Sequence, residues 1–205
     1  MTHTFRNRPN RKLELDNGET VWISRSCAVV AEVLLFQCDS KEWYVLLGKR
    51  GNNVPDYKNC WGLPCGYLDW DETTYEAFLR EVWEETSLYL PELLKSSNCS
   101  SCTGIVERGA SSYPAACKIS ERSTGPTQNI SFHFKAIVHW SSDSLPKLGI
   151  ENAEEGEATE ANWIKLSEAI DMDLAFSHSN RLREIRDEIF LHDSTLAVNK
   201  FQKSD

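Results

Sequence analysis

Short apolar runs along the chain predict the strands of one sheet. Residues 28–36 are mostly apolar and have the length of a strand. A second run at 43–47 follows the turn-forming segment 38–41, so the two runs predict a β-hairpin. Residues 129–140 alternate instead, with apolar side chains at the even positions from Ile130 to Val138, and this pattern predicts a strand with one apolar face.

Two other segments show helical spacing. Residues 73–86 predict a helix on which Ala77, Phe78 and Val82 form an apolar stripe for the core. Residues 181–191 carry four apolar side chains at helical spacing and predict a second helix near the C-terminus.

The ends and connections of these elements carry weaker signals. Asp71 is the expected N-cap of the first helix, with Thr74 at the position where a capping box would have an acid. An acidic loop is expected at 145–159. A short strand at Trp163–Ile164 follows it, and then a helical turn near 168–170.

These elements predict one domain with extensions at both ends. We expect an N-terminal arm at 1–19, the domain with its C-terminal helix at 20–195, and a tail at 196–205. Residues 95–127 are rich in Ser, Cys and Gly and give only weak strand signals. The apolar segment Val21–Ile23 either caps the sheet or joins a partner, which allows a homodimer.

Composition narrows the class of protein. The net charge of −9 argues against non-specific binding to nucleic acid, which requires a basic face. No apolar run approaches the length of a membrane helix, and the first residues lack the apolar region of a signal peptide. Seven cysteines without a framework spacing favour a reducing cytoplasm. Cys99 and Cys102 form a single CxxC pair, which is only half of a zinc site, so we interpret them as two cysteines in a loop.

One face of the first predicted helix suggests chemistry. Glu81, Glu84 and Glu85 stand at i, i+3 and i+4, so their carboxylates share a face. Carboxylates crowded together repel each other, and a hard divalent cation among them relieves this repulsion. Mg²⁺ is usually held by a few carboxylates and the phosphates of a substrate. The alternative from these residues alone is an acidic helix face in contact with solvent.

The wider spacing resembles the Nudix box of the Nudix hydrolases, and about residues 20–170 resemble the family. Six spaced positions carry the resemblance: Gly66, Glu72, Arg80, Glu81, Glu84 and Glu85. The chain departs from the family pattern at Ser87, where a Gly would end the helix with positive φ, and at Cys65, where Gly is frequent. The resemblance implies an α/β/α sandwich in which helices flank a mixed sheet.

The resemblance also implies roles for the acidic residues. Glu84 and Glu85 are the first expected ligands of Mg²⁺, for which Mn²⁺ can substitute, and the backbone carbonyl of Cys65 is a further expected ligand. Glu81 is either a third ligand or the base that positions a water molecule. Glu157 is the best candidate from the acidic loop for metal or base work, ahead of Glu160.

Basic residues complete the expected site. A bidentate pair of Arg80 with Glu72 would hold the loop against the helix and orient Glu81. Arg50, at the end of a predicted strand, would meet a substrate phosphate. Its alternative role is that of a surface charge.

The expected function is hydrolysis of a nucleoside diphosphate linked to another group, with a small nucleotide as partner. ADP-ribose or a similar nucleotide sugar is the leading substrate, because residues 174–178 resemble a segment of nucleotide-sugar Nudix proteins and of Nudix-derived transcription regulators. A non-catalytic regulatory domain and an RNA 5′-end or NTP pyrophosphohydrolase are the alternatives.

Overall fold

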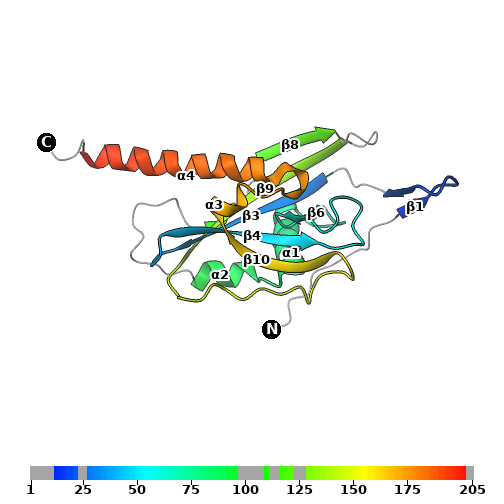
Figure 1. The fold of residues 1–205 in the computed structure, drawn as a ribbon, viewed down its shortest axis with the longest axis horizontal. Helices are drawn as coiled ribbons and strands as arrows, with labels where there is room; N and C mark the ends of the chain where they lie inside the picture. Colours follow the sequence, from blue (N-terminus) through cyan, green and yellow to red (C-terminus); the bar gives the residue numbers. More distant parts are fainter. Residues whose placement is uncertain (1–11, 23–26, 97–108, 111–115, 122–127, 202–205) are drawn as a thin grey trace.

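The chain is described here by a computed structural model in which one sheet lies between helices (Figure 1). The structure describes residues 12–22, 27–96, 109–110, 116–121 and 128–201. The strands are β1 (Lys12–Glu14), β2 (Thr20–Trp22), β3 (Cys27–Gln37), β4 (Glu42–Arg50), β5 (Trp61–Gly62), β6 (Cys65–Tyr67), β7 (Gly109–Ala110), β8 (Ala116–Glu121), β9 (Gln128–Trp140) and β10 (Ala158–Lys165). The helices are α1 (Thr74–Thr86), α2 (Leu90–Ser96), α3 (Leu166–Ala169), the 3-10 turn η1 (Ala175–Ser177) and α4 (His178–Phe201).

The main sheet is mixed. Its central order is β10-β4-β3-β9-β7, while β5 pairs with β4, β6 with β3 and β8 with β9. Strands β3 and β9 run parallel, from the pair Cys27 and Ile130 to the pair Gln37 and Trp140, and the other pairings are antiparallel. The predicted hairpin is confirmed, because β3 and β4 pair in the antiparallel register that sets Leu34 opposite Val45.

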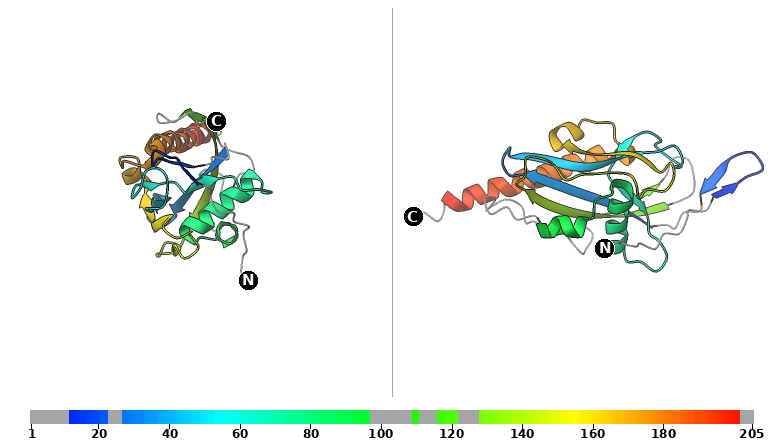
Figure 2. Two further views of the ribbon diagram at one scale, coloured as in Figure 1. Left: turned by 90° about the vertical axis from the view of Figure 1, so that its right-hand side faces the viewer. Right: turned by 90° about the horizontal axis from the view of Figure 1, so that it is seen from below.

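Alternate side chains of the central strands build two apolar layers. On β3, Val29, Ala31 and Val33 pack into the layer that contains Phe78 and Val82 of α1. The intervening residues of β3 face a second layer, which contains apolar residues of α3 and α4. Figure 2 shows α1 and α4 on opposite faces of the sheet. The predicted α/β/α sandwich is therefore confirmed.

Helix α1 starts differently from the prediction. Asp71 is not the N-cap, because its backbone has a φ of 62° and belongs to the turn before the helix. Thr73 caps the helix instead: its hydroxyl accepts from the Glu76 N–H at 3.2 Å, and the Glu76 carboxylate accepts from the Thr73 N–H at 2.8 Å. This is a complete capping box two residues further along the chain. The other end agrees with the prediction, because Ser87 adopts the left-handed φ of 52° that the family's Gly would favour.

The chain ends differ from the predicted ranges. Lys12–Glu14 pairs with Thr20–Trp22 in a separate two-stranded sheet, so the expected boundary after residue 19 falls within a hairpin. The C-terminal helix begins at His178 and continues to Phe201, beyond the predicted 181–191. Cys99, Cys102 and Ile23 lie outside the described residues. Within the described part of the chain, no helix has the length and apolar character needed to cross a bilayer.

A buried ionic network joins α4 to the sheet. Glu32 of β3 is fully buried, and Arg181 of α4 donates to both of its carboxylate oxygens, at 2.6 and 3.0 Å. His133 of β9 lies 2.9 Å from the same carboxylate. Burial opposes the ionisation of Glu32, but the hydrogen bonds from His133 and Arg181 outweigh it and lower the pKa of that carboxyl. Glu184 and Glu188 accept from the other side of the Arg181 guanidinium.

Candidate active site

The acidic face of α1 is buried. Glu81, Glu84 and Glu85 are only 4%, 6% and 8% exposed, so the alternative of a solvent-exposed acidic helix face is wrong. All three lie on one side of α1, while Ala77, Phe78 and Val82 enter the core from the other side as predicted. Charged carboxylates are rarely buried without partners, so their environment decides what this face can do.

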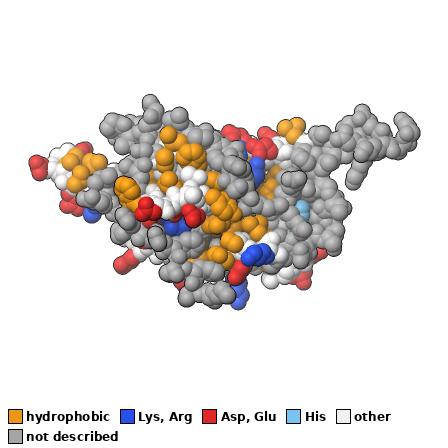
Figure 3. Space-filling view, turned by 180° about the vertical axis from the view of Figure 1, so that it is seen from behind, with side chains coloured by type: hydrophobic (Ala, Val, Ile, Leu, Met, Phe, Trp, Pro, Cys, Tyr) orange, Lys and Arg blue, Asp and Glu red, His pale blue; other side chains and the backbone are white. Residues whose placement is uncertain are grey.

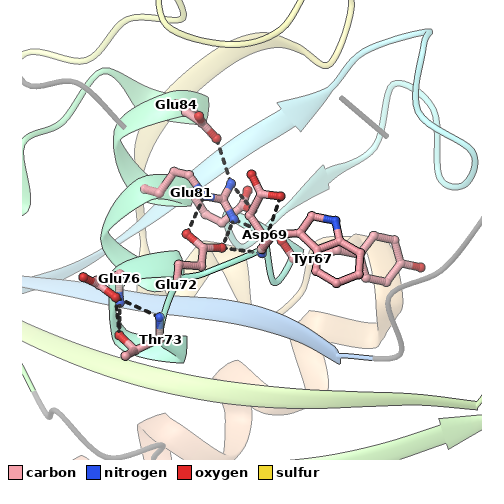
Figure 4. A network of polar contacts seen from close by, with 9 residues as sticks. Tyr67, Asp69, Glu72, Thr73, Glu76, Glu81 and Glu84 are labelled. Carbon is pink, nitrogen blue, oxygen red and sulfur yellow. Dashed lines mark hydrogen bonds and ion pairs between the residues drawn. The ribbon is translucent and has the colours of Figure 1, made fainter. Parts of the chain in front are cut away.

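Arg80 is the main partner of these carboxylates. Its guanidinium forms a bidentate pair with Glu72, at 2.8 and 3.0 Å. Its Nη1 donates to Glu81 Oε1 at 2.7 Å and to Glu84 Oε2 at 2.9 Å. Figure 4 shows the carboxylates of Glu72, Glu81 and Glu84 pointing toward one another, with the dashed lines of their hydrogen bonds and ion pairs meeting between them. The structure therefore brings together the Arg–Glu pair that the sequence predicted.

The same guanidinium fixes the loop that leads into α1. Arg80 Nη2 donates to the Tyr67 carbonyl at 3.0 Å, and Glu72 accepts a hydrogen bond from the Asp69 N–H. Burial opposes the charge of Arg80, but the negative charges of Glu81 and Glu84 and the bonds to Glu72 outweigh it, so the pKa of Arg80 is raised. Arg80 is therefore a permanent cation that ties the loop and two carboxylates to one another.

Glycines let the sheet approach these carboxylates closely. A Cβ on Gly66 of β6 would stand 2.2 Å from Glu81 Oε1, well inside van der Waals contact. A Cβ on Gly48 of β4 would stand 3.3 Å from Glu85 Oε2. The Nudix-box Gly at position 66 is thus required by the space that Glu81 occupies, while the contact at Gly48 was not predicted.

The carboxylates share more negative charge than their surroundings balance. Burial raises the pKa of Glu84 to about 7, against the opposing effect of Arg80, and the charges of Glu157 and Glu154 add to the increase. Burial is also the largest cause of the raised pKa values of Glu81 and Glu85. The charge of Glu157 raises both further. A cluster of this kind gains free energy from any group that brings positive charge into it.

Glu157 reaches the cluster through the pairing of two distant segments. The Gly51 N–H donates to the Glu157 carbonyl at 2.7 Å, just before β10 pairs with β4. Burial and the charge of Glu154 raise the pKa of the Glu157 carboxyl. Glu160, the second loop candidate, is exposed and pairs in register with Lys49. The structure therefore brings Glu157 near the α1 carboxylates, in agreement with the preference for Glu157.

Arg50 ends β4 beside the cluster. Its Nε donates to the Asp56 carbonyl at 3.1 Å, and its Nη1 lies 4.0 Å from Cys65 Sγ. Its charge lowers the pKa values of Glu85 and Glu157, which places a cation next to both. Burial raises the pKa of the Cys65 thiol to about 12, so this side chain stays a neutral thiol. The Cys65 backbone hydrogen-bonds Glu85. The expected metal-binding role of its carbonyl stays a prediction.

The donor set fits a hard divalent cation. Five carboxylates, from Glu72, Glu81, Glu84, Glu85 and Glu157, surround the guanidinium groups of Arg80 and Arg50. Carboxylate oxygens are the ligands that Mg²⁺ prefers. Among the described residues, however, no three acidic, His or Cys side chains are already arranged as a coordination shell. In this structure Arg80 engages Glu81 and Glu84.

Residues 174–178 lie closer to the site than the sequence alone indicated. His178, at the start of α4, is buried, and its Nδ1 accepts from the Leu63 N–H at 3.0 Å. A Cβ on Gly62 would touch both Ala175 and His178 at 3.3 Å. The similarity of this segment to other Nudix proteins was the signal that could have pointed to its contact with the entry of the Nudix box.

Several solved structures share the fold of this chain. The NUDIX domain of Shewanella oneidensis NrtR, complexed with ADP ribose, is similar with a TM-score of 0.54 and 20% identity, over 81% of this chain and 89% of that one. A Caenorhabditis elegans Ap4A hydrolase binary complex has a TM-score of 0.52 and 14% identity, over 79% and 96%. A Francisella tularensis bifunctional NMN adenylyltransferase/ADP ribose pyrophosphatase, complexed with AMP and a Mn ion, has a TM-score of 0.51 and 21% identity, over 78% and 41%.

At these identities the structural likeness shows the fold alone. A search of the curated proteins found no match. The family model, in contrast, matches most of the chain: the NUDIX domain model aligns with residues 28–189, which include every candidate site residue. The chain therefore belongs to the NUDIX domain family, that of the Nudix hydrolases.

Proposed function

We propose that this protein hydrolyses the diphosphate bond of a nucleoside diphosphate linked to another group, with ADP-ribose or a similar nucleotide sugar as the leading substrate. One observation carries the proposal: buried carboxylates with raised pKa values lie beside a cation, Arg50, at the end of β4. Such a cluster is poorly matched to a stable core and well matched to bound cations and phosphates.

The residues proposed to hold Mg²⁺ are Glu81, Glu84, Glu85, Glu157 and the Cys65 carbonyl, with Mn²⁺ as a substitute. When bound, the ion neutralises diphosphate oxygens and acidifies a water molecule. Glu81 and Glu157 are the two candidates for the group that takes the proton from that water, because burial raises the pKa of both towards the range of an effective base. Arg50 is proposed to bind a phosphate of the substrate.

Arg80 and Glu72 are proposed to position the site. Arg80 holds Glu81 and Glu84 from one side and the loop at Glu72 from the other, so it fixes the spacing of the carboxylates. The Glu81 and Glu84 carboxylates that this guanidinium engages would also hold the metal ion.

The choice of substrate class rests on weaker support. Residues 174–178 resemble a segment of nucleotide-sugar Nudix proteins and contact the entry of the box. The similar Shewanella domain is complexed with ADP ribose, and the similar Francisella protein is named an ADP ribose pyrophosphatase. We also propose that the chain acts as one domain with the hairpin of β1 and β2 as an N-terminal arm, and that it can form a homodimer.

A ligand-binding regulatory domain is the second candidate, since the same segment resembles Nudix-derived regulators. Against it stands the complete carboxylate set, which a purely regulatory domain does not require. Cleavage of RNA 5′ ends requires a basic track, and the face in Figure 3 shows its coloured Lys and Arg side chains scattered rather than gathered. The net charge of −9 also argues against a basic track for RNA.

The proposal is tested by phosphate release with Mg²⁺, a coupled phosphatase and a panel of substrates. The panel contains ADP-ribose, sugar nucleotides, dinucleoside polyphosphates and NTPs, and each is assayed with Glu84→Gln and with the exposed control Glu168→Gln. Turnover of ADP-ribose or a sugar nucleotide that Glu84→Gln lowers by about a hundredfold or more, and that Glu168→Gln leaves unchanged, supports the proposal. Folded, Mg²⁺-binding protein that turns over no member of the panel would favour the regulatory alternative.

A further inference from the structure

Two exposed aromatic rings lie together beside Arg50. Tyr57, in the loop after β4, and Phe176, in η1, have ring centroids 4.6 Å apart and are 48% and 39% exposed. Large apolar side chains are usually buried, and a pair of them left in contact with solvent is available to a ligand. The two rings come from segments more than one hundred residues apart, so the fold itself assembles the pair.

The backbone at both rings is strained. Tyr57 and Phe176 have φ values of 52° and 55°, and Ser177 follows with 57°. The left-handed region is disfavoured for bulky side chains because Cβ approaches the following carbonyl oxygen. Residues held in such conformations cluster at binding sites, where the surrounding structure keeps a side chain in a useful place. Here two residues in this conformation, on separate segments, carry exposed aromatic rings.

The surroundings hold both segments in place. The Asp56 carbonyl, next to Tyr57, accepts from Arg50 Nε at 3.1 Å. On the other segment, His178 Nδ1 accepts from the Leu63 N–H at 3.0 Å. Phe176 lies between these two anchors, 5.6 Å from the His178 ring. The pair is thus fixed before any ligand arrives, which lowers the entropy lost on binding.

Arg50 links the pair to the carboxylates. Its guanidinium carbon lies 4.9 Å from the Phe176 ring centroid, in a cation–π contact. The same guanidinium is close enough to Glu85 and Glu157 to lower the pKa values of both. Arg50 therefore lies next to both the aromatic pair and the proposed metal-binding cluster. A ligand with a planar ring next to a diphosphate could contact both.

We propose that Tyr57 and Phe176 form the subsite that binds the nucleobase of the substrate by stacking, with Arg50 between this subsite and the diphosphate. The proposal rests on the proposed function for the identity of the ligand class, a nucleoside 5′-phosphate. Stacking uses the face of a base and does not read its edge. The subsite is therefore expected to favour nucleotides over base-free sugar phosphates while discriminating weakly among bases.

The test measures binding rather than turnover, by NMR titration of the full chain with AMP and, separately, with ribose 5-phosphate. Tyr57→Leu and Phe176→Leu are expected to weaken AMP binding by about 5- to 150-fold, the range typical of one base–aromatic stack. Ribose 5-phosphate should bind the wild type and both variants alike. Phe190→Leu is the matched control, since Phe190 is an aromatic residue 63% exposed on α4, and it should bind AMP as the wild type does.

Two further variants separate binding from folding. Tyr57→Phe keeps the ring and should retain AMP binding. Phe176→Gly removes the ring and relieves the positive φ, so its thermal unfolding temperature should equal or exceed that of Phe176→Leu while AMP binding is lost. Equal wild-type affinity for AMP and ribose 5-phosphate, or unchanged AMP binding in both leucine variants, would overturn the proposal. Ring-dependent AMP binding without any hydrolysis would support this subsite and count against the proposed function alone.

Discussion

Glu81 occupies the space that a side chain at Gly66 would need. The Cβ of any other residue at position 66 would stand 2.2 Å from Glu81 Oε1. The first residue of the Nudix box and the first acid of the α1 face are thus fitted to each other in space, although 14 residues lie between them in the sequence.

This contact predicts the effect of Gly66→Ala. The methyl group displaces the Glu81 carboxylate, the end of a flexible side chain, and breaks its bond to Arg80, while the core is left intact. We expect turnover to fall by about a hundredfold, because a displacement of about 1 Å in a catalytic group has effects of that size. The melting temperature should change little. Steady-state kinetics and thermal unfolding check both expectations, and full activity in Gly66→Ala would contradict the fit.

The end of α1 offers a prediction about backbone strain. Ser87 has a φ of 52°, and its hydroxyl donates to Glu151 at 2.8 Å and accepts from Asn152 at 3.1 Å. Ser87→Ala and Ser87→Gly both lose these bonds, but only Gly relieves the left-handed conformation. We expect Ser87→Gly to be more stable than Ser87→Ala by about 1 kcal/mol. Urea denaturation of the two variants measures this difference, and equal stabilities would show that the strain is absent.

The link between α4 and the sheet predicts a large effect of Arg181→Met. That variant leaves the fully buried Glu32 without its bidentate partner. Breaking a buried ion pair on one side typically destabilises by about 3–5 kcal/mol. The double variant Glu32→Leu with Arg181→Met removes both charges and should recover most of the loss. Chemical denaturation of the single and double variants measures their free energies of unfolding. If both variants lose the same free energy, the arginine stabilises the protein by packing alone.

The raised pKa values predict how pH and Mg²⁺ act together on stability. The folded-state pKa of Glu84, about 7, exceeds its ordinary value of 4.5, so the folded protein holds this proton more tightly than the unfolded chain does. Without metal, the contribution to stability is complete below pH 4.5 and is lost as pH rises towards 7. The raised pKa values of Glu81, Glu85 and Glu157 act in the same direction. The lowered pKa of Glu32 has the opposite effect, a loss of stability as pH falls, and this loss begins only below its ordinary pKa of 4.5.

Mg²⁺ binds the ionised carboxylates and should therefore reverse this loss. We expect Mg²⁺ to raise the melting temperature strongly at pH 8.5 and hardly at all at pH 5.5, and we expect activity to increase with pH in the same range. Thermal unfolding with and without Mg²⁺ at several pH values provides the measurement. An equal Mg²⁺ effect at both pH values would argue against the carboxylates as its binding site.

The central part of the site could be predicted because its signal is local. Glu81, Glu84 and Glu85 share a face through helical spacing alone, and the apolar stripe on the opposite side fixes which face is buried. The alternation of residues 129–140 likewise placed one face of β9 against α1, where Phe134, Ala136 and Val138 are fully buried. Patterns with a fixed period can be recognised without knowing the rest of the fold.

Features formed by distant segments could not be predicted. Glu32, His133 and Arg181 come from three elements, and nothing in the sequence around any one of them indicates the other two. The pair of Tyr57 with Phe176 likewise depends on how η1 meets the loop after β4.

Helix ends were misplaced for a different reason. The Thr73–Glu76 capping box begins α1, whereas Asp71 has a positive φ and lies in the turn before it. The short helix α2 (Leu90–Ser96) offers too few turns for a periodic signal and was not predicted.

The measurement that tests the account most directly is Mn²⁺ binding at pH 8, followed by electron paramagnetic resonance, in wild-type protein and single Glu→Gln variants. We predict saturable binding that Glu84→Gln and Glu85→Gln each weaken by about tenfold or more, whereas Glu168→Gln, an exposed acid on α3, binds as the wild type does. Binding that is absent in the wild type, or equal in all four proteins, would contradict the claim that the buried face of α1 is a metal site.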